Sequence, residues 1–162
     1  MYSLRVTFTG IVSKFNNSHI AIFISILSMS EIRSSSQLLA VSTMYLLYSK
    51  ELNQNKNLLT PIVKNNCKSH VFHQYTLRVL SGNRDELSKY LNDNNIPHGI
   101  YYPIPLHKQK AYSDKNYKEE DFKISNMMSE QVISLPMHSE LDNDQIKFIC
   151  KKINKFFTAQ EN

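Results

Sequence analysis

The sequence predicts an α+β fold, a short sheet with helices packed on one face. Two patterns support this class: residues 70–80 alternate as a strand does, and residues 142–157 repeat apolar side chains at helical spacing. A chain of 162 residues, 41% of them hydrophobic, is long enough for about one domain. Helices and strands mixed in one small domain pack in layers around a single core.

The first segment, residues 1–57, has one possible helix. Apolar residues are nearly continuous over 37–48, which predicts a helix there, and the polar residues 50–57 indicate its end or a linker. The alternative is that residues 1–50 stay partly disordered.

An apolar run at Ile20–Leu27 has more than one interpretation. It is too short to span a bilayer, which needs about 20 residues. Arg5 and Lys14 before it and Ser28–Ser30 after it give it the order of a secretory signal peptide, although the rest of the chain shows no other secretory trait. Otherwise it is a buried strand or a stretch without native structure.

Residues 70–80 have the alternation of a strand in a β-branched and aromatic context. One face is largely apolar and the other is mixed. The apolar face consists of Val71, His73, Tyr75, Leu77 and Val79.

A short amphipathic helix is expected after the turn at Ser81–Gly82. Asn83 can cap it, with Glu86 three residues further on, and its apolar positions recur at i, i+3 and i+4 from Leu87. The polar residues 92–95 end it.

A second strand is predicted at Gly99–Tyr102. Pro103 stops it, because proline removes a hydrogen-bond donor and restrains the residue before it. Residues 103–120 then form a long aromatic and charged connection.

Two more helices follow this connection. Asp121 can cap a helix that carries Val132 and Ile133 and is broken by Leu135–Pro136. The final helix is the clearest element, with an apolar stripe at Ile146, Ile149, Cys150, Ile153, Phe156 and Phe157.

The ends of the final helix fit its assignment. Asp142 and Gln145 form a capping-box pair at its start, and a basic face follows the opposite side. A membrane-surface or partner helix is an alternative, but ordinary core packing is favoured, with Cys150 as a small apolar residue. The basic face consists of Lys147, Lys151, Lys152 and Lys155.

The charge distribution argues against nucleic-acid binding. The net charge of +5 lies entirely in residues 1–69, where the cations are scattered singly, and residues 70–162 are neutral. A phosphate-tracking surface needs clustered cations. The three glycines lie too far apart to build a phosphate loop, which excludes Walker and Rossmann motifs.

The sequence gives little support for a metal site or for a catalytic nucleophile. The six histidines show no HxxxH or HExxH spacing, and Cys67 and Cys150 form no CxxC. Cys67 stands in a polar loop without a nucleophile elbow, which indicates an ordinary surface thiol. We therefore expect no metal site.

The segment Gly99–His107 is the best candidate for function. Tyr101 and Tyr102 at a strand end, prolines that fix the backbone, and His107 after them present hydroxyl and imidazole groups suited to a phosphate or a sugar hydroxyl. The alternative is purely structural, with the tyrosines on opposite faces of a sheet edge and His107 closing a turn.

Several short motifs recur in order along the second part of the chain. They are Thr60–Val63, His73–Tyr75, Arg84–Leu87, Gly99–His107, Ala111–Tyr112, Ser134–His138 and Glu140–Leu141. Together they resemble the C-terminal part of the PLP-dependent nucleotide-sugar aminotransferases of the DegT/DnrJ/StrS type, in the fold-type I superfamily. The resemblance covers residues 58–157 as the C-terminal small domain and leaves 158–162 as a tail.

The resemblance implies amino transfer from glutamate to a keto-sugar nucleotide, a step in making polysaccharide or glycan precursors. Pyridoxal phosphate carries the chemistry as an electron sink. The tyrosine-proline segment contacts the sugar nucleotide in this family, which makes Tyr101, Tyr102 and His107 the candidate substrate-binding residues. Many members have histidine at the position of Tyr101. Nucleotide-sugar substrates also imply a cytoplasmic location.

The chain departs from the family in one large respect. Nothing in it resembles the Schiff-base lysine, the pyridinium-pairing Asp or the phosphate-binding residues of the large PLP domain. Residues 1–50 show no family motif either. The expected product is a C-terminal fragment, from a truncated or frame-shifted gene, that is inactive alone and carries neither catalytic residues nor its own PLP.

Two alternatives remain open at this point. A separate PLP-domain chain could complete a split enzyme, or the chain could be a non-catalytic module that binds sugar nucleotides. Because the domain normally packs on a large domain and a homodimer partner, we expect exposed apolar surface and self-association.

Overall fold

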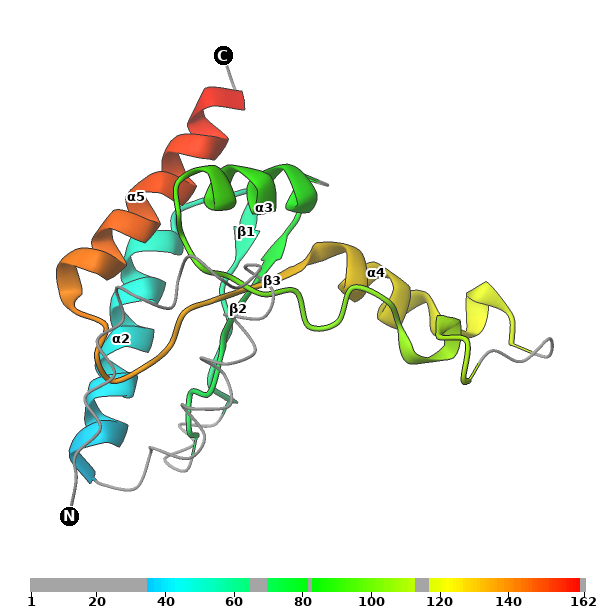
Figure 1. Ribbon diagram of the computed structural model, residues 1–162, viewed down its shortest axis with the longest axis horizontal. Helices are drawn as coiled ribbons and strands as arrows, with labels where there is room; N and C mark the ends of the chain where they lie inside the picture. Colours follow the sequence, from blue (N-terminus) through cyan, green and yellow to red (C-terminus); the bar gives the residue numbers. More distant parts are fainter. Residues whose placement is uncertain (1–34, 65–69, 82, 113–116, 161–162) are drawn as a thin grey trace.

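The computed structural model describes residues 35–64, 70–81, 83–112 and 117–160 (Figure 1). Helices and a small antiparallel sheet alternate along the chain, which confirms the predicted α+β class. The elements are α2 (Ser35–Leu52), β1 (Leu58–Leu59), β2 (Tyr75–Val79), α3 (Arg84–Asp93), η3 (Leu106–Lys108), η4 (Glu119–Phe122), α4 (Lys123–Gln131), β3 (Val132–Leu135) and α5 (Asn143–Gln160).

The sheet has the order β1-β2-β3, with β2 in the centre. Tyr75 pairs with Leu135 and Arg78 with Val132, and an isolated bridge joins Gly99 to Ser134 beyond the named strands. Gly99 therefore lies beside β3 and brings the chain segment after it to the sheet edge.

The predicted strand at 70–80 is confirmed for Tyr75–Val79 only. Tyr75, Leu77 and Val79 are buried, as the alternation predicts. The prediction was wrong for residues 70–74, where Val71 is 53% exposed and Phe72 has a positive φ of 47°. A left-handed backbone interrupts the pleat, so the alternation of side chains ends there.

Two predicted boundaries were wrong in the second half. The helix expected to include Val132 and Ile133 ends at Gln131, and these residues begin β3. A β-branched run pairs better with a neighbouring strand than it continues a helix. The strand expected at Gly99–Tyr102 is reduced to the single bridge at Gly99.

The predicted caps have mixed outcomes. Asp142 and Gln145 form the expected capping box, with Asp142 Oδ1 accepting from the Gln145 N–H at 2.7 Å. Asn83 stands before α3, but its side chain makes no cap hydrogen bond. Asp121 does not cap α4, because it lies within η4, where it accepts from the Lys118 N–H.

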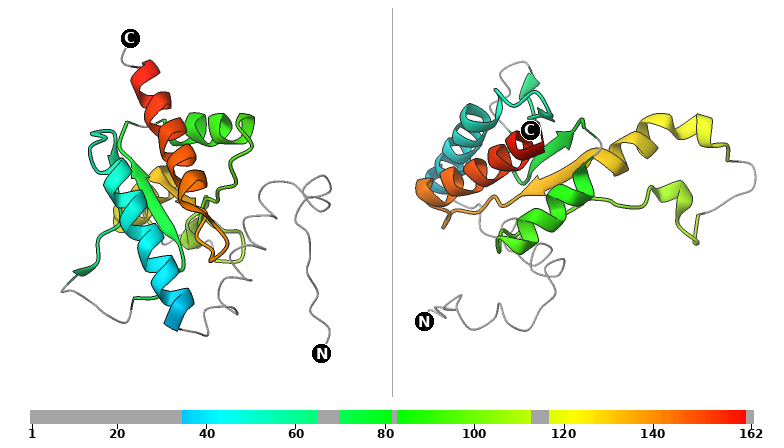
Figure 2. Two further views of the ribbon diagram at one scale, coloured as in Figure 1. Left: turned by 90° about the vertical axis from the view of Figure 1, so that its left-hand side faces the viewer. Right: turned by 90° about the horizontal axis from the view of Figure 1, so that it is seen from above.

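One hydrophobic core joins β2 to α2, α3 and α5, with α2 and α5 side by side (Figures 1 and 2). The helix predicted at 37–48 is confirmed within the longer α2, whose buried residues are Val41, Met44, Tyr48 and Leu52. All six predicted apolar positions of α5 are buried. The sheet, α2, α3 and α5 are called the body below.

Polar contacts fix the helices of the body to each other and to the segment after β3. The Tyr48 hydroxyl donates to the Pro136 carbonyl at 3.2 Å, and Asn154 Nδ2 donates to the Glu51 carbonyl at 3.1 Å. On the basic face of α5, Lys152 donates to Asn94 Oδ1 at 2.6 Å.

The buried thiol behaves as the sequence predicts. Cys150 is 1% exposed, and burial raises its pKa to about 12. It is therefore an apolar packing group at neutral pH. Cys67, like Ile20–Leu27, lies outside the described residues. Along the described ranges, no helix combines the length and apolar character of a membrane span.

Residues 103–112 and 117–131 form an arm that projects away from the body (Figures 1 and 2). It contains η3, η4 and α4 and returns to the sheet at β3. The long connection predicted over 103–120 is therefore the outgoing half of this arm.

Candidate functional site

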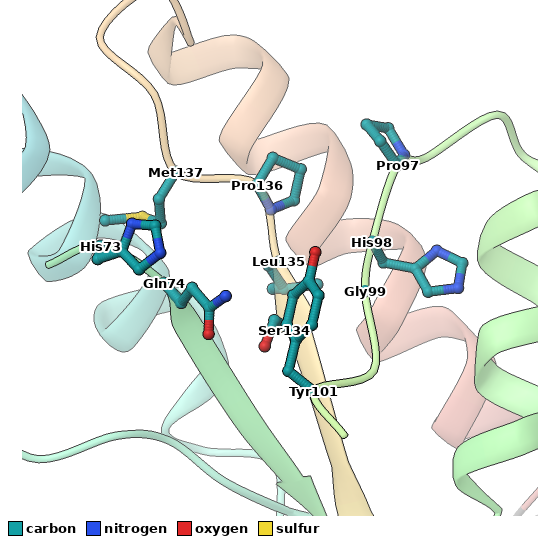
Figure 3. Close-up of a pocket in the computed structure, with 10 residues that line it drawn as sticks. All are labelled: His73, Gln74, Pro97, His98, Gly99, Tyr101, Ser134, Leu135, Pro136 and Met137. Carbon is teal, nitrogen blue, oxygen red and sulfur yellow. The ribbon is translucent and has the colours of Figure 1, made fainter. Parts of the chain in front are cut away.

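A pocket opens where the segment after α3 crosses β3 and the start of β2 (Figure 3). It lies at the root of the arm, between elements far apart in the sequence. Its lining residues are His73, Gln74, Pro97, His98, Gly99, Tyr101, Ser134, Leu135, Pro136 and Met137.

Gly99 and Tyr101 define one wall of this pocket. Gly99 donates its N–H to the Ser134 carbonyl at 3.0 Å and accepts from the Ser134 N–H at 2.7 Å. The Tyr101 ring lies directly over Gly99, where a Cβ atom would be 2.6 Å from the ring. A Cβ at this position would displace the Tyr101 ring, and glycine avoids that displacement.

Tyr101 presents a protonated phenol to the pocket. Burial raises the pKa of Tyr101, and the neighbouring Tyr102 raises it further. The hydroxyl is thus neutral at physiological pH and can both donate and accept a hydrogen bond. Figure 3 shows its ring between β3 and residues 97–99, with Gln74 at the start of β2.

His98 supports the wall from behind. Its ring points away from Tyr101 toward α3, where Nε2 lies 2.7 Å from the Ser88 hydroxyl (Figure 3). Nδ1 lies 3.0 Å from the Ile96 carbonyl, which can only accept, so Nδ1 carries the proton and Nε2 accepts from Ser88. Burial lowers the pKa of His98, which favours this neutral form.

The structure separates the three residues that the sequence singled out. Tyr101 lines the pocket, but Tyr102 is 74% exposed and does not. His107 lies in the arm, where its ring stacks on Phe122 with centroids 4.1 Å apart. Their predicted roles in substrate binding remain predictions.

His73 and Gln74 line the pocket beside Tyr101, although sequence reasoning assigned them no role. The signal was present in the His73–Tyr75 motif, which was used only for the resemblance. Neighbouring strand residues point to opposite faces, but the strand begins at Tyr75, so both side chains reach one opening.

The lining residues offer hydrogen-bonding groups but no carboxylate, ammonium or guanidinium. None of the ten is Lys, Arg, Asp or Glu. PLP needs an amine for its Schiff base and a carboxylate for its pyridine nitrogen. The pocket therefore does not fit PLP by its own residues. Among the described residues, no three His, Cys, Asp or Glu side chains gather as a metal site.

Comparison with known proteins decides the family. The model of the DegT/DnrJ/EryC1/StrS aminotransferase family matches residues 4–154. The chain belongs to this family. The resemblance drawn from the motifs is confirmed, and the match also reaches into residues 1–50, where the motifs indicated none.

Curated relatives in this family are sugar transaminases, among others. The chain is 40% identical over 91 residues to a UDP-2-acetamido-2-deoxy-3-oxo-D-glucuronate aminotransferase of Pseudomonas aeruginosa, covering 56% of this chain and 24% of that one. It is 36% identical to a dTDP-3-amino-3,6-dideoxy-alpha-D-galactopyranose transaminase of Aneurinibacillus thermoaerophilus, covering 55% of this chain and 23% of that one. A pleiotropic regulatory protein of Geobacillus stearothermophilus is 39% identical, and the match covers 54% of this chain and 23% of that one. The chain thus spans less than a quarter of these relatives.

Two solved structures share the fold. A family aminotransferase from Brucella abortus superposes with a TM-score of 0.66 at 27% identity, over 75% of this chain and 31% of that one. DesV of S. venezuelae, solved with a ketimine intermediate, gives a TM-score of 0.69 at 24% identity. That match covers 75% of this chain and 32% of DesV. The body and arm are therefore the counterpart of about a third of such a chain.

Proposed function

We propose that this chain forms the small-domain wall of a nucleotide-sugar aminotransferase site, and that its pocket holds the sugar. The named activities of the curated relatives support this assignment. The observation that carries it is the pocket itself, where Tyr101 and Gln74 present neutral hydrogen-bonding groups without a charged residue. Neutral donors and acceptors suit sugar hydroxyls.

In this proposal the pocket residues have separate roles. The Tyr101 hydroxyl and the Gln74 amide bind and orient the sugar ring, while Gly99 sets the position of Tyr101. Tyr102 and His107 contact the nucleotide end from outside the pocket, as the family resemblance implies. PLP, when bound by the rest of the enzyme, supplies the electron sink for amino transfer from glutamate.

The rest of the active site comes from elsewhere in the enzyme. The residues described here provide neither the Schiff-base lysine nor the pyridinium carboxylate at the pocket. We infer that the chain alone is inactive, and that a PLP domain, on a separate chain or a dimer partner, completes the site in the cytoplasm. Purified chain should then show no PLP absorbance and no transaminase turnover.

Calorimetry with UDP-sugars tests the binding role directly. We expect a weak site with a Kd of roughly 0.1 to 1 mM for the wild-type chain. Tyr101→Phe should weaken binding, while the matched Tyr112→Phe, on an exposed arm residue, should leave it unchanged. No heat from the wild-type chain, or equal affinity in both variants, contradicts the assignment of the pocket.

A second candidate is a binding module without catalysis. It is favoured by one observation, that the pocket lining offers hydrogen-bonding groups but neither an amine nor a carboxylate for PLP. Coexpression with a PLP-domain chain separates the two: copurification and turnover support the enzyme, and sugar binding without either supports the module.

A further inference from the structure

The arm joins the body at two places. The outgoing chain leaves at Gly99, which is bonded to Ser134 by the two backbone hydrogen bonds of the bridge. The returning chain arrives through α4, which passes directly into β3 (Figure 1). The orientation of the arm therefore depends on what fixes the end of α4.

A buried arginine from another element holds that end. Arg84, the first residue of α3, is 7% exposed, and its Nη1 donates to the Ser129 carbonyl at 3.0 Å and to the Val132 carbonyl at 3.3 Å. Of the charged side chains in the described ranges, it is the one that is buried. Its Nε lies 2.6 Å from Asp85 Oδ1, outside hydrogen-bond angles.

This contact supplies what α4 lacks. The last carbonyls of a helix have no partner within it, and its C-terminus favours a cation. The last turn of α4 contains no basic residue. Arg84 provides both the donors and the charge, and a hydrogen bond from a charged donor is stronger than a neutral one.

A second arginine adds a weaker contact at the same end. Arg78 of β2 donates to Gln131 Oε1 through Nη2 at 2.8 Å and through Nε at 3.2 Å. Arg78 is only half-buried, so water competes for its guanidinium. Arg84 is therefore the principal anchor and Arg78 the auxiliary one.

The arm transmits the position of α4 to its outgoing half. Asn126 of α4 donates to Glu119 Oε2 at 2.7 Å, and Lys108 lies 3.0 Å from the same oxygen. His107 stacks on Phe122 next to them. Fixing α4 thus helps to fix the outgoing half of the arm at His107 and Lys108, which follow the tyrosine-proline segment.

We propose that Arg84 is a positioning residue that sets the direction of the arm by capping α4, and with it the place of the tyrosine-proline segment. This inference goes beyond the proposed function, because it holds whether or not the pocket takes a sugar.

Single tryptophan reporters test it, since the chain contains no Trp. Ile124→Trp places a reporter on the exposed face of α4, and Phe148→Trp places a control on the exposed face of α5. Time-resolved fluorescence anisotropy then compares each reporter with and without Arg84→Met. The Met variant keeps the apolar stem and removes the donors.

We expect Arg84→Met to raise the amplitude of the fast, nanosecond component about twofold at residue 124 and to leave residue 148 unchanged. Arg84→Lys should recover part of the slow component, because an ammonium still donates to the Ser129 carbonyl. Arg78→Met should have a smaller effect at residue 124.

Three results would overturn the proposal. An unchanged reporter at residue 124 would show that Arg84 does not hold the arm. An equal rise at both reporters, including unfolding of the variant, would assign Arg84 to the body as a whole. A rise at residue 124 as large in Arg78→Met as in Arg84→Met would contradict Arg84 as the principal anchor.

Discussion

The body and the arm are held together by different forces. In α5 of the body, six apolar side chains are buried in the shared core. In α4 of the arm, Ser129 is the buried residue, and η3 and η4 bury none. Burial of apolar area stabilises the body, whereas the arm depends on polar contacts at its root. The two regions should therefore respond differently to the same substitution.

The arm also differs from the body in the apolar side chains that it leaves exposed. They include Ile104, Leu106, Tyr112 and Ile124, each more than half exposed. Apolar residues gathered on one projecting region are typical of an interface. Self-association of the isolated chain, as the sequence predicts, remains to be checked by light scattering, and a monodisperse monomer would contradict it.

The largest expected effect comes from a matched pair of Ile→Ala substitutions. Ile153 of α5 is fully buried, so Ile153→Ala should lower the free energy of unfolding by about 2–5 kcal/mol through lost packing and a cavity. Ile124 of α4 is 74% exposed, so Ile124→Ala should change it by less than about 0.5 kcal/mol. Urea unfolding measures the free energy of unfolding of both variants. Equal losses of stability would contradict the difference between the body and the arm.

A smaller effect is expected at the junction of the two regions. Gly99→Ala places a Cβ against the Tyr101 ring and should cost about 1 kcal/mol, at the low end for overpacking because a side chain can move aside. In a Tyr101→Ala background the same change should cost almost nothing. A double-mutant cycle by urea unfolding measures this coupling, and additive losses would show that Gly99 and Tyr101 are independent.

The smallest expected effect is a pH dependence in the body. Burial lowers the pKa of His98 in the folded state, while the unfolded chain keeps the ordinary value of about 6.5. The unfolded state then binds more protons below that pH, so stability is full above about 6.5 and falls as the pH drops toward the folded pKa.

Urea unfolding across about pH 5 to 8 measures how the free energy of unfolding changes with pH. His98→Asn cannot titrate and should flatten this part of the profile, while His70→Gln, at an exposed site, should leave it in place. An identical slope in wild type and His98→Asn would exclude His98 as its source.

Sequence patterns predict the body better than the arm, and for a physical reason. The stripe of α5 and the alternation from Tyr75 to Val79 reflect burial on one face, which is what periodicity records. Val132–Leu135 is buried at every position, and a continuous apolar run does not distinguish a helix end from a strand.

The site was predictable in part. Tyr101 was found because its motif is local, but Gln74 comes from a segment far along the chain that only folding brings beside it. Arg84 was noted as part of a helix start, yet its two carbonyl partners lie 45 and 48 residues away. No local pattern records contacts of that separation.

The pairing of α2 with α5 has a consequence for synthesis of the protein. Asn55 and Asn154 share a hydrogen bond across 99 residues, and Tyr48 and Leu52 pack in the same core as the buried face of α5. Because α2 precedes α5 in the chain, the ribosome delivers α2 first, and the apolar side of α2 stays uncovered until α5 has emerged. Completion of the core therefore waits for α5, and in this interval the uncovered apolar side chains of α2 are exposed to chaperones.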